Sequence, residues 1–107
     1  MDTKDVEITY EGKKEIVTIK KLSWGEANEA LRRSIKTTIN GKDVDIVSQR
    51  ENELLLSIIK APFKLNIESL KQLDKQKGDK IFSEFSQLNK VTKEEEKKSE
   101  SESGKTN

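Results

Sequence analysis

Cysteine and histidine are both absent from this chain of 107 residues. The lack of cysteine excludes disulfides, thiolate metal sites and cysteine nucleophiles. The lack of histidine removes the commonest general base and the commonest ligand of transition metals, and it makes a Ser-His-Asp triad impossible. We therefore expect a protein that is not an enzyme, with no catalytic residues, no metal-binding residues and no cofactor.

Apolar residues are also scarce. Hydrophobic residues make up 31% of the chain and charged residues 38%, so only a small core can form. The longest nearly unbroken apolar run, residues 54–59, is far too short to cross a bilayer. The first residues lack the apolar stretch of a signal peptide. We expect a soluble, cytoplasmic protein without a membrane partner.

The net charge of the chain is only +1, so no overall field attracts nucleic acid. Basic residues do cluster at 13–14, 20–21 and 32–33, where a hairpin and a helix are expected. Such a face can follow a phosphate backbone, although acidic residues are interleaved with it. A small nucleic-acid-binding accessory protein, of viral or mobile-element origin, is therefore the alternative reading of the sequence.

The N-terminal stretch predicts a β-hairpin. Apolar and polar residues alternate over 6–10, as in a strand with one buried face. Residues 11–14 are expected to form the turn, where Gly12 can take a positive φ. Apolar residues within 16–19 do not alternate cleanly, which predicts either a bulge or a strand covered on both faces. A lone hairpin is marginal in water, so it must pack on another element.

A helix is expected to follow, because Ser23 and Glu26 have the spacing of a capping box. The only tryptophan of the chain, Trp24, would lie in the first turn of this helix. Apolar residues recur at helical spacing on one face: Trp24, Ala27, Leu31 and Ile35. We expect this face to be buried, with Trp24 filling the junction between hairpin and helix.

The segment after this helix allows two readings. Asn40 and Gly41 form a strong turn signal, so residues 37–39 and 44–46 are compatible with a second small hairpin. A plain loop is equally compatible with these residues.

Helical spacing returns in the second half of the chain. A central core helix is expected from Asp45 or Ser48 to Lys60, followed by a short helix capped by Asn66. A last helix is expected to be capped by Asp79. The predicted fold class is therefore α+β, with an N-terminal β-hairpin packed on three to four short α-helices.

The C-terminal segment differs in composition from the rest. Residues 90–107 contain one apolar residue among many lysines and glutamates. Such a segment cannot bury enough surface to offset the entropy of ordering it. We expect residues 1–89 to form a single small α+β domain and residues 90–107 a disordered charged tail.

Two passages resemble tail assembly chaperones of long-tailed phages and related prophage or archaeal-virus proteins. Residues 22–26 are similar to the "L-T-W-G-E"-like start of the first helix in that family. Residues 73–89 are similar to its "L-x-x-x-D-G-x-x-L"-like passage into a last helix that ends near "LN", although Gly78 and Asp79 stand in reversed order. The resemblance covers roughly residues 5–90.

The resemblance implies a non-enzymatic, protein-binding chaperone in the cytoplasm of a host cell. Proteins of this family escort the long, mostly helical tape-measure protein until tail tube subunits polymerise around it. This chain would cover apolar stripes of that client in the helix-in-groove mode, and tube protein would then displace it. The implied partners are a tape-measure-like helical protein and a tail tube protein, with a homo-oligomer left open.

Apolar residues that the core does not need are the candidates for partner binding. Phe63 and Leu65 flank a lysine in an extended connection, while Phe82 and Phe85 dominate the last helix. All four side chains can instead be core residues. Core packing is the first reading for Phe82 and Phe85, and the two readings are equal for Phe63 and Leu65.

Overall fold

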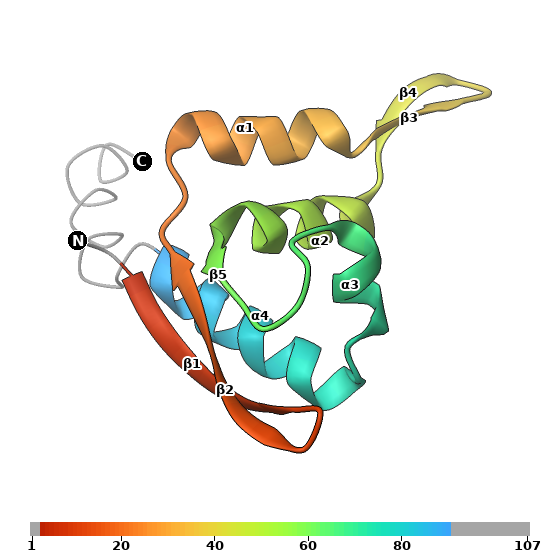
Figure 1. The fold of residues 1–107 in the computed structure, drawn as a ribbon. Helices are drawn as coiled ribbons and strands as arrows, with labels where there is room; N and C mark the ends of the chain where they lie inside the picture. Colours follow the sequence, from red (N-terminus) through yellow and green to blue (C-terminus); the bar gives the residue numbers. More distant parts are fainter. Residues whose placement is uncertain (1–2, 91–107) are drawn as a thin grey trace, which may run out of the picture.

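A computed structural model of the chain describes residues 3–90 and confirms the predicted α+β class (Figure 1). The predicted charged tail, apart from Lys90, lies outside the described residues. An N-terminal hairpin is followed by helices, a second hairpin and one short strand. In chain order the elements are β1 (Thr3–Tyr10), β2 (Lys13–Lys20), α1 (Trp24–Arg33), β3 (Ile35–Thr38), β4 (Gly41–Val44), α2 (Ile46–Ser57), β5 (Ile58–Lys60), α3 (Ile67–Gln72) and α4 (Lys75–Asn89).

The first hairpin is the larger part of a three-stranded antiparallel sheet with the order β1-β2-β5. Its turn consists of Glu11 and Gly12, whose φ angles are 51° and 78°. Two positive φ angles are typical of a type I′ turn, so the prediction for Gly12 is confirmed. The pairing of β2 with β5 shifts register between Thr18 and Ile19, which is the irregularity expected in this strand.

One face of this sheet is buried and the other faces solvent. Val6 and Val17 are directly opposite each other, so their side chains lie on the same face. Ile8 and Ile19 share that face and are also buried. Ile16 points to the opposite face and is exposed. The uneven apolar pattern of β2 therefore comes from one outward isoleucine beside two inward residues.

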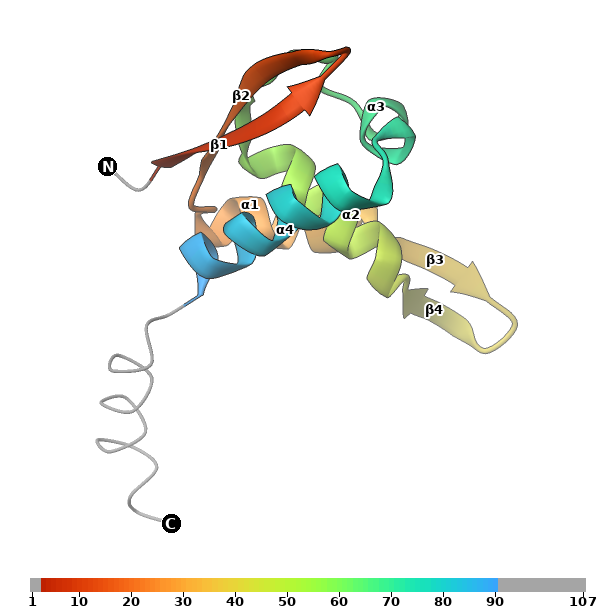
Figure 2. The same cartoon turned by 90° about the horizontal axis from the view of Figure 1, so that it is seen from below.

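Helix α4 forms the centre of the domain, because it packs on both strands of the hairpin and on α2 (Figure 2). Ile81 and Phe85 are the residues of α4 that become buried. Together with residues from the sheet, α2 and α3, they form one core, made of Val6, Ile8, Val17, Ile19, Leu54, Ile58, Leu70, Ile81 and Phe85. The core is small, as the composition predicts.

The helix starts agree with the sequence in all cases but one. Ser23 and Glu26 form the predicted capping box, and Asn66 caps α3. Helix α4 is capped by Asp74, whose side chain accepts a hydrogen bond from the Lys77 backbone N–H, so the prediction of Asp79 as the cap is wrong. Glycine inside a helix costs only about 1 kcal/mol relative to alanine. The hydrogen bonds of the additional turn and of its cap offset this cost, so the helix begins before Gly78.

The end of α2 also differs from the prediction. The helix stops at Ser57 rather than at Lys60, because residues 58–60 form strand β5 against β2. Ile58 pairs with Ile19, and both are buried. β-branched isoleucines suit a strand better than a helix end, and the sheet provides a partner that the local sequence does not reveal.

The second turn signal produces a hairpin rather than a plain loop. β3 pairs with β4, with Thr38 opposite Gly41 and Ile39 and Asn40 forming the turn between them. The two strands begin two and three residues earlier than the predicted ones. In both views the hairpin projects away from the helices (Figures 1 and 2).

Strand β1 is an edge strand of the three-stranded sheet. The backbone carbonyl of Glu7 points away from β2, and the Lys80 Nζ of α4 donates a hydrogen bond to it. A second link joins the same two elements, since Lys4 forms an ion pair with Glu84.

Within residues 3–90, every helix is too short or too polar to span a bilayer.

Candidate protein-binding surfaces

Trp24 does not fill the junction between hairpin and helix, as the sequence predicts, because its side chain is 85% exposed. The capping box fixes its position. The Ser23 side chain accepts a hydrogen bond from the Glu26 N–H at 3.1 Å, and the Glu26 carboxylate accepts one from the Ser23 N–H at 2.9 Å. Lys20 forms an ion pair with the same carboxylate. The first turn of α1 is thus firmly held, with the indole in solvent.

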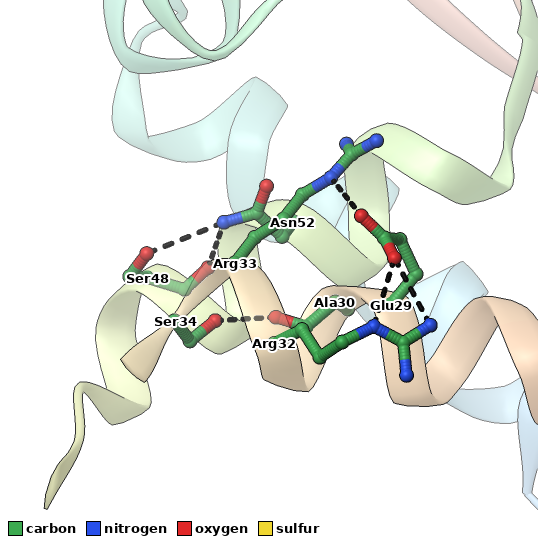
Figure 3. A network of polar contacts seen from close by, with 7 residues as sticks. All are labelled: Glu29, Ala30, Arg32, Arg33, Ser34, Ser48 and Asn52. Carbon is green, nitrogen blue, oxygen red and sulfur yellow. Dashed lines mark hydrogen bonds and ion pairs between the residues drawn. The ribbon is translucent and has the colours of Figure 1, made fainter. Parts of the chain in front are cut away.

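Helix α1 contacts α2 through small and polar side chains (Figure 3). Ala30 is the one fully buried residue of α1, and Ser34 just after the helix is also buried. The Ser34 hydroxyl donates to the Ala30 carbonyl at 2.6 Å. Across the contact, Asn52 is buried and donates to the Ser48 carbonyl at 2.8 Å. Small side chains let the two helices approach closely, so the large apolar side chains of α1 stay outside the contact.

Three of the four apolar residues predicted to face the core are therefore exposed. Trp24 and Leu31 lie on α1, whereas Ile35 is the first residue of β3. Further exposed apolar side chains lie close by in the chain: Ile39, Ile46 and Val47. Ile39, at the tip of the second hairpin, is 100% exposed. Most of the large exposed apolar side chains of residues 3–90 thus belong to α1, the second hairpin and the start of α2.

A second apolar surface is an open groove of about 240 Å³ between α2, α3 and the start of α4. We call it the α2–α4 groove. Its apolar lining comes from Val47, Leu54, Leu70, Leu73 and Phe82. Charged residues of both signs surround this lining: Arg50, Glu51, Asp74, Lys75 and Asp79.

The charged side chains around the groove are held in place by one another. The Arg50 guanidinium lies over the Phe82 ring, 4.2 Å from its centroid. The same guanidinium is 3.5 Å from Asp79, which also pairs with Lys75 at 2.6 Å. The cation covers one face of the Phe82 ring, while the half-buried ring still lines the groove.

The four predicted binding residues have different environments. Phe82 is half-buried and lines the groove, whereas Phe85, one helical turn later, is only 4% exposed and belongs to the core. Phe63 is half-buried and packs on Tyr10, with ring centroids 5.7 Å apart. Leu65 is 45% exposed. The structure thus gives a partner direct access to Leu65, partial access to Phe63 and Phe82, and none to Phe85.

Sequence reasoning did not find the groove, because its lining comes from three separate helices. Leu54 is far from Leu70 and Leu73 in the sequence, and only their meeting beside Phe82 creates a surface. Val47, at the start of α2, is an exposed part of the same lining. One signal in the sequence does point to an additional apolar surface. Residues 47–59 contain more apolar side chains than one face of a helix can bury in the core.

Comparison with models of protein families, with curated proteins and with solved structures finds no match to this chain. The passages that resemble tail assembly chaperones have local structural roles here. Residues 22–26 include the capping box of α1, and residues 73–89 contain the Asp74 cap and all of α4.

Within residues 3–90, four carboxylates have lowered pKa values, each because of a hydrogen-bonded cation. The pKa of Glu26 is lowered chiefly by Lys20, and that of Glu29 by Arg33 and Arg32. Lys77 lowers the pKa of Asp74, and Lys75 lowers that of Asp79. These are surface ion pairs that fix helix ends and exposed faces. Among residues 3–90, no three acidic side chains are grouped so that they could hold a metal ion.

A pH-dependent effect is expected for Glu26→Gln. The folded pKa of Glu26 lies below its ordinary value of about 4.3, so the charged form stabilises the fold above that pH. The variant should be less stable than the parent at pH 7, by less than about 1 kcal/mol, since the pair is partly exposed. This difference should shrink as the pH falls through the lowered pKa.

Thermal unfolding of both proteins between pH 7 and pH 2.5 measures this effect. Glu51→Gln is the control, because no salt bridge joins Glu51 to another of residues 3–90. A difference between Glu26→Gln and the parent that grows toward low pH would contradict the assigned ion pair.

Proposed function

We propose that this protein is a non-enzymatic, protein-binding chaperone of the tail assembly type. It would hold a tape-measure-like helical protein in solution until tail tube subunits compete for that client. The observation that carries the proposal is the α2–α4 groove, which presents Phe82 and Leu73 to solvent inside a charged border. The family resemblance supplies the identity of the client, and the groove supplies the place where it would bind.

The groove suits one or two anchor side chains of a helix. Its volume of about 240 Å³ is below the roughly 300–1,000 Å³ typical of small-molecule sites. A client helix with apolar residues at i, i+3 or i+4, and i+7 would insert its central anchor beside Phe82. The mixed charges of the border would face the polar flanks of that helix without favouring one net charge.

Weak, reversible binding follows from the same geometry. A groove this small buries little apolar area, and the free energy gained from that burial is partly cancelled by the entropy lost on association. Related complexes differ mostly in how fast they dissociate, so a weak complex releases its client quickly when a competitor arrives. Rapid release is what a chaperone needs if tube subunits are to replace it.

The alternative function, nucleic-acid binding, has less support from the side chains that suggested it. Lys20 is paired with Glu26, while Arg32 and Arg33 are both paired with Glu29. The basic face expected from hairpin and helix is thereby partly neutralised. A nucleic-acid binder would show an affinity for DNA or RNA that falls steeply with salt, so absence of binding at low salt would remove this alternative.

The test is binding of a helical tape-measure fragment to the full chain and to Val47→Glu. Val47 is 65% exposed and lines the groove, so the substitution adds a charge there without disturbing the core. We expect the affinity to fall about tenfold, as for an anchor contact of about 1.4 kcal/mol. The fragment should also stay in solution with the parent chain but not with the variant.

The matched control is Ile16→Glu, since Ile16 is an exposed isoleucine on the outer face of the sheet. This control should bind the fragment within about twofold of the parent. Equal binding by Val47→Glu and the parent would exclude the groove as the client site. No binding of the fragment by the parent chain would refute the proposed function itself.

A further inference from the structure

We propose that a pocket between the start of α1, the second half of α2 and the end of α4 binds one arginine side chain of a partner protein. The pocket has a volume of about 320 Å³, and Trp24 and Glu53 are part of its lining. We call it the Trp24–Glu53 pocket. The inference does not rest on the proposed function, because this pocket shares no residue with the α2–α4 groove.

Three helices supply the lining of the pocket. Trp24 and Ala27 come from the start of α1, and Leu22 lies just before it. Glu53 comes from α2, and Asn89 is the last residue of α4. The volume is close to the lower limit of the roughly 300–1,000 Å³ that is typical of small-molecule sites. The pocket therefore suits a single long side chain rather than a large ligand.

The walls of the pocket are held together before anything binds. The Asn89 side chain accepts a hydrogen bond from the Leu22 backbone N–H at 2.6 Å, which ties the end of α4 to the segment before α1. The capping box of Ser23 and Glu26 fixes the first turn of α1, which carries Trp24. A preformed site loses less conformational entropy when a ligand binds, so even a small pocket can be selective.

The charge of the pocket favours a cation. Glu53 is the one charged residue among the described residues of the lining, and no salt bridge joins it to another of residues 3–90. Its carboxylate accepts a long hydrogen bond of 3.5 Å from the Gln49 side chain. Because Glu53 is half-buried, it has lost part of its water without gaining a cation. A positive group in the pocket would supply that cation.

The end of α4 adds to the negative potential. The carbonyl groups of a last helical turn lack N–H partners within the helix and carry partial negative charge. Helix α4 has no basic residue in its last turn, and Asn89 places this end of the helix at the pocket. The positive end of the α1 dipole is also near, but the Glu26 carboxylate in its first turn offsets that charge.

The exposed indole of Trp24 favours arginine among the basic side chains. Tryptophan attracts cations more strongly than the other aromatic residues do, and the planar guanidinium of arginine can stack on its ring. A guanidinium can also donate two parallel hydrogen bonds to one carboxylate, such as that of Glu53. The apolar side chains of Leu22 and Ala27 suit the aliphatic part of the arginine.

The fluorescence of Trp24 tests the proposal directly, because this residue is the only tryptophan of the chain. N-acetyl-arginine amide, added to the full chain at low salt, should change the emission in a saturable way, with a dissociation constant of about 1 mM. N-acetyl-citrulline amide has nearly the same shape without the charge and should cause no saturable change. N-acetyl-lysine amide should bind more weakly than the arginine compound, because its ammonium group is not planar.

Glu53→Gln keeps the shape of the side chain and removes its charge. This variant should bind the arginine amide about tenfold more weakly than the parent. Glu51→Gln is the matched control, since Glu51 belongs to the same helix but lines the α2–α4 groove, and it should bind like the parent. Both variants should melt at the parent temperature, because neither glutamate forms a salt bridge within residues 3–90. A loss of binding then reports the pocket and not unfolding.

A second comparison tests whether the arginine belongs to a polypeptide. A blocked tripeptide with arginine at its centre should bind more tightly than agmatine, which carries the same guanidinium without a peptide backbone. Tighter binding of agmatine would assign the pocket to a free small molecule and overturn the proposed occupant.

Other results would overturn the inference as a whole. Equal binding of the arginine and citrulline compounds would do so, as would binding that Glu53→Gln does not weaken, or no saturable change with the parent chain. Binding that appears only after Lys90→Gln would show that the lysine after α4 already fills the pocket. Val47→Glu should lose the helical client yet keep the arginine amide, so failure of the proposed function and failure of this inference are distinguishable.

Discussion

Replacing Phe85 with alanine is expected to lower the free energy of unfolding by about 3–5 kcal/mol. The Phe85 ring is 4% exposed and lies 5.5 Å from the Phe82 ring, in the helix that packs on both the sheet and α2. Removing it leaves a cavity at the centre of a small core, which cannot collapse to fill it. A domain of this size has a total stability of only about 5–15 kcal/mol, so this loss is a large fraction of the total.

Urea unfolding followed by circular dichroism measures this loss. Leu65→Ala is the matched control, because Leu65 is another large apolar candidate for binding but is 45% exposed. It should cost about 1 kcal/mol or less. A loss below about 1 kcal/mol for Phe85→Ala would show that the ring is not part of the core, and would restore Phe85 as a binding residue.

The second large effect is expected at Asn89, in the last turn of α4. Its Oδ1 accepts a hydrogen bond from the Leu22 backbone N–H at 2.6 Å, and its Nδ2 donates to the Phe85 carbonyl at 3.0 Å. One amide therefore ties the end of α4 to the segment that leads from β2 into α1. Asn89→Ala should cost about 1–3 kcal/mol, because the partly buried Leu22 N–H loses its partner.

Two further variants sharpen this measurement. Gln87→Ala removes an exposed amide from the same helical turn and should change the stability by no more than about 0.5 kcal/mol. Asn89→Asp keeps an acceptor for Leu22 but places a negative charge at the C-terminal end of the helix, so it should not restore the parent stability. Full stability in Asn89→Ala would mean that the link contributes nothing.

Local signals in the sequence predicted local structure well. The turn at Gly12, the capping box at Ser23 and the cap at Asn66 each depend on residues within four positions of one another. Such features form from backbone hydrogen bonds that neighbouring side chains complete. The sequence therefore predicts the first hairpin, the helices and the α+β class, but not strand β5.

Whether Trp24 is buried or exposed depends on contacts between α1 and other elements, which the local sequence does not contain. Trp24 and Leu31 lie on one side of α1, as their spacing predicts, but this spacing does not say which side of a helix meets its neighbour. Ala30 allows α2 to approach closely on another side of α1, so the larger side chains remain in solvent. Small residues can thus decide a helix contact over large ones.

The candidate binding residues show the same limit. Phe82 and Phe85 are one turn apart and read as equivalent, yet Phe85 points into the core and Phe82 towards the groove. The direction of each ring follows from where α2 and α3 lie around α4. The sequence predicts which helix carries the aromatic residues but not which ring a partner can reach.

Strand β1 has a consequence for how copies of this chain meet in a crowded solution. An uncapped outer strand is a template on which other molecules can extend a sheet without limit. Here the Lys80 ammonium donates a hydrogen bond to the outward carbonyl of Glu7, so an incoming strand would have to break that bond or bury the cation away from water. Either route disfavours extension of the sheet at this position of β1.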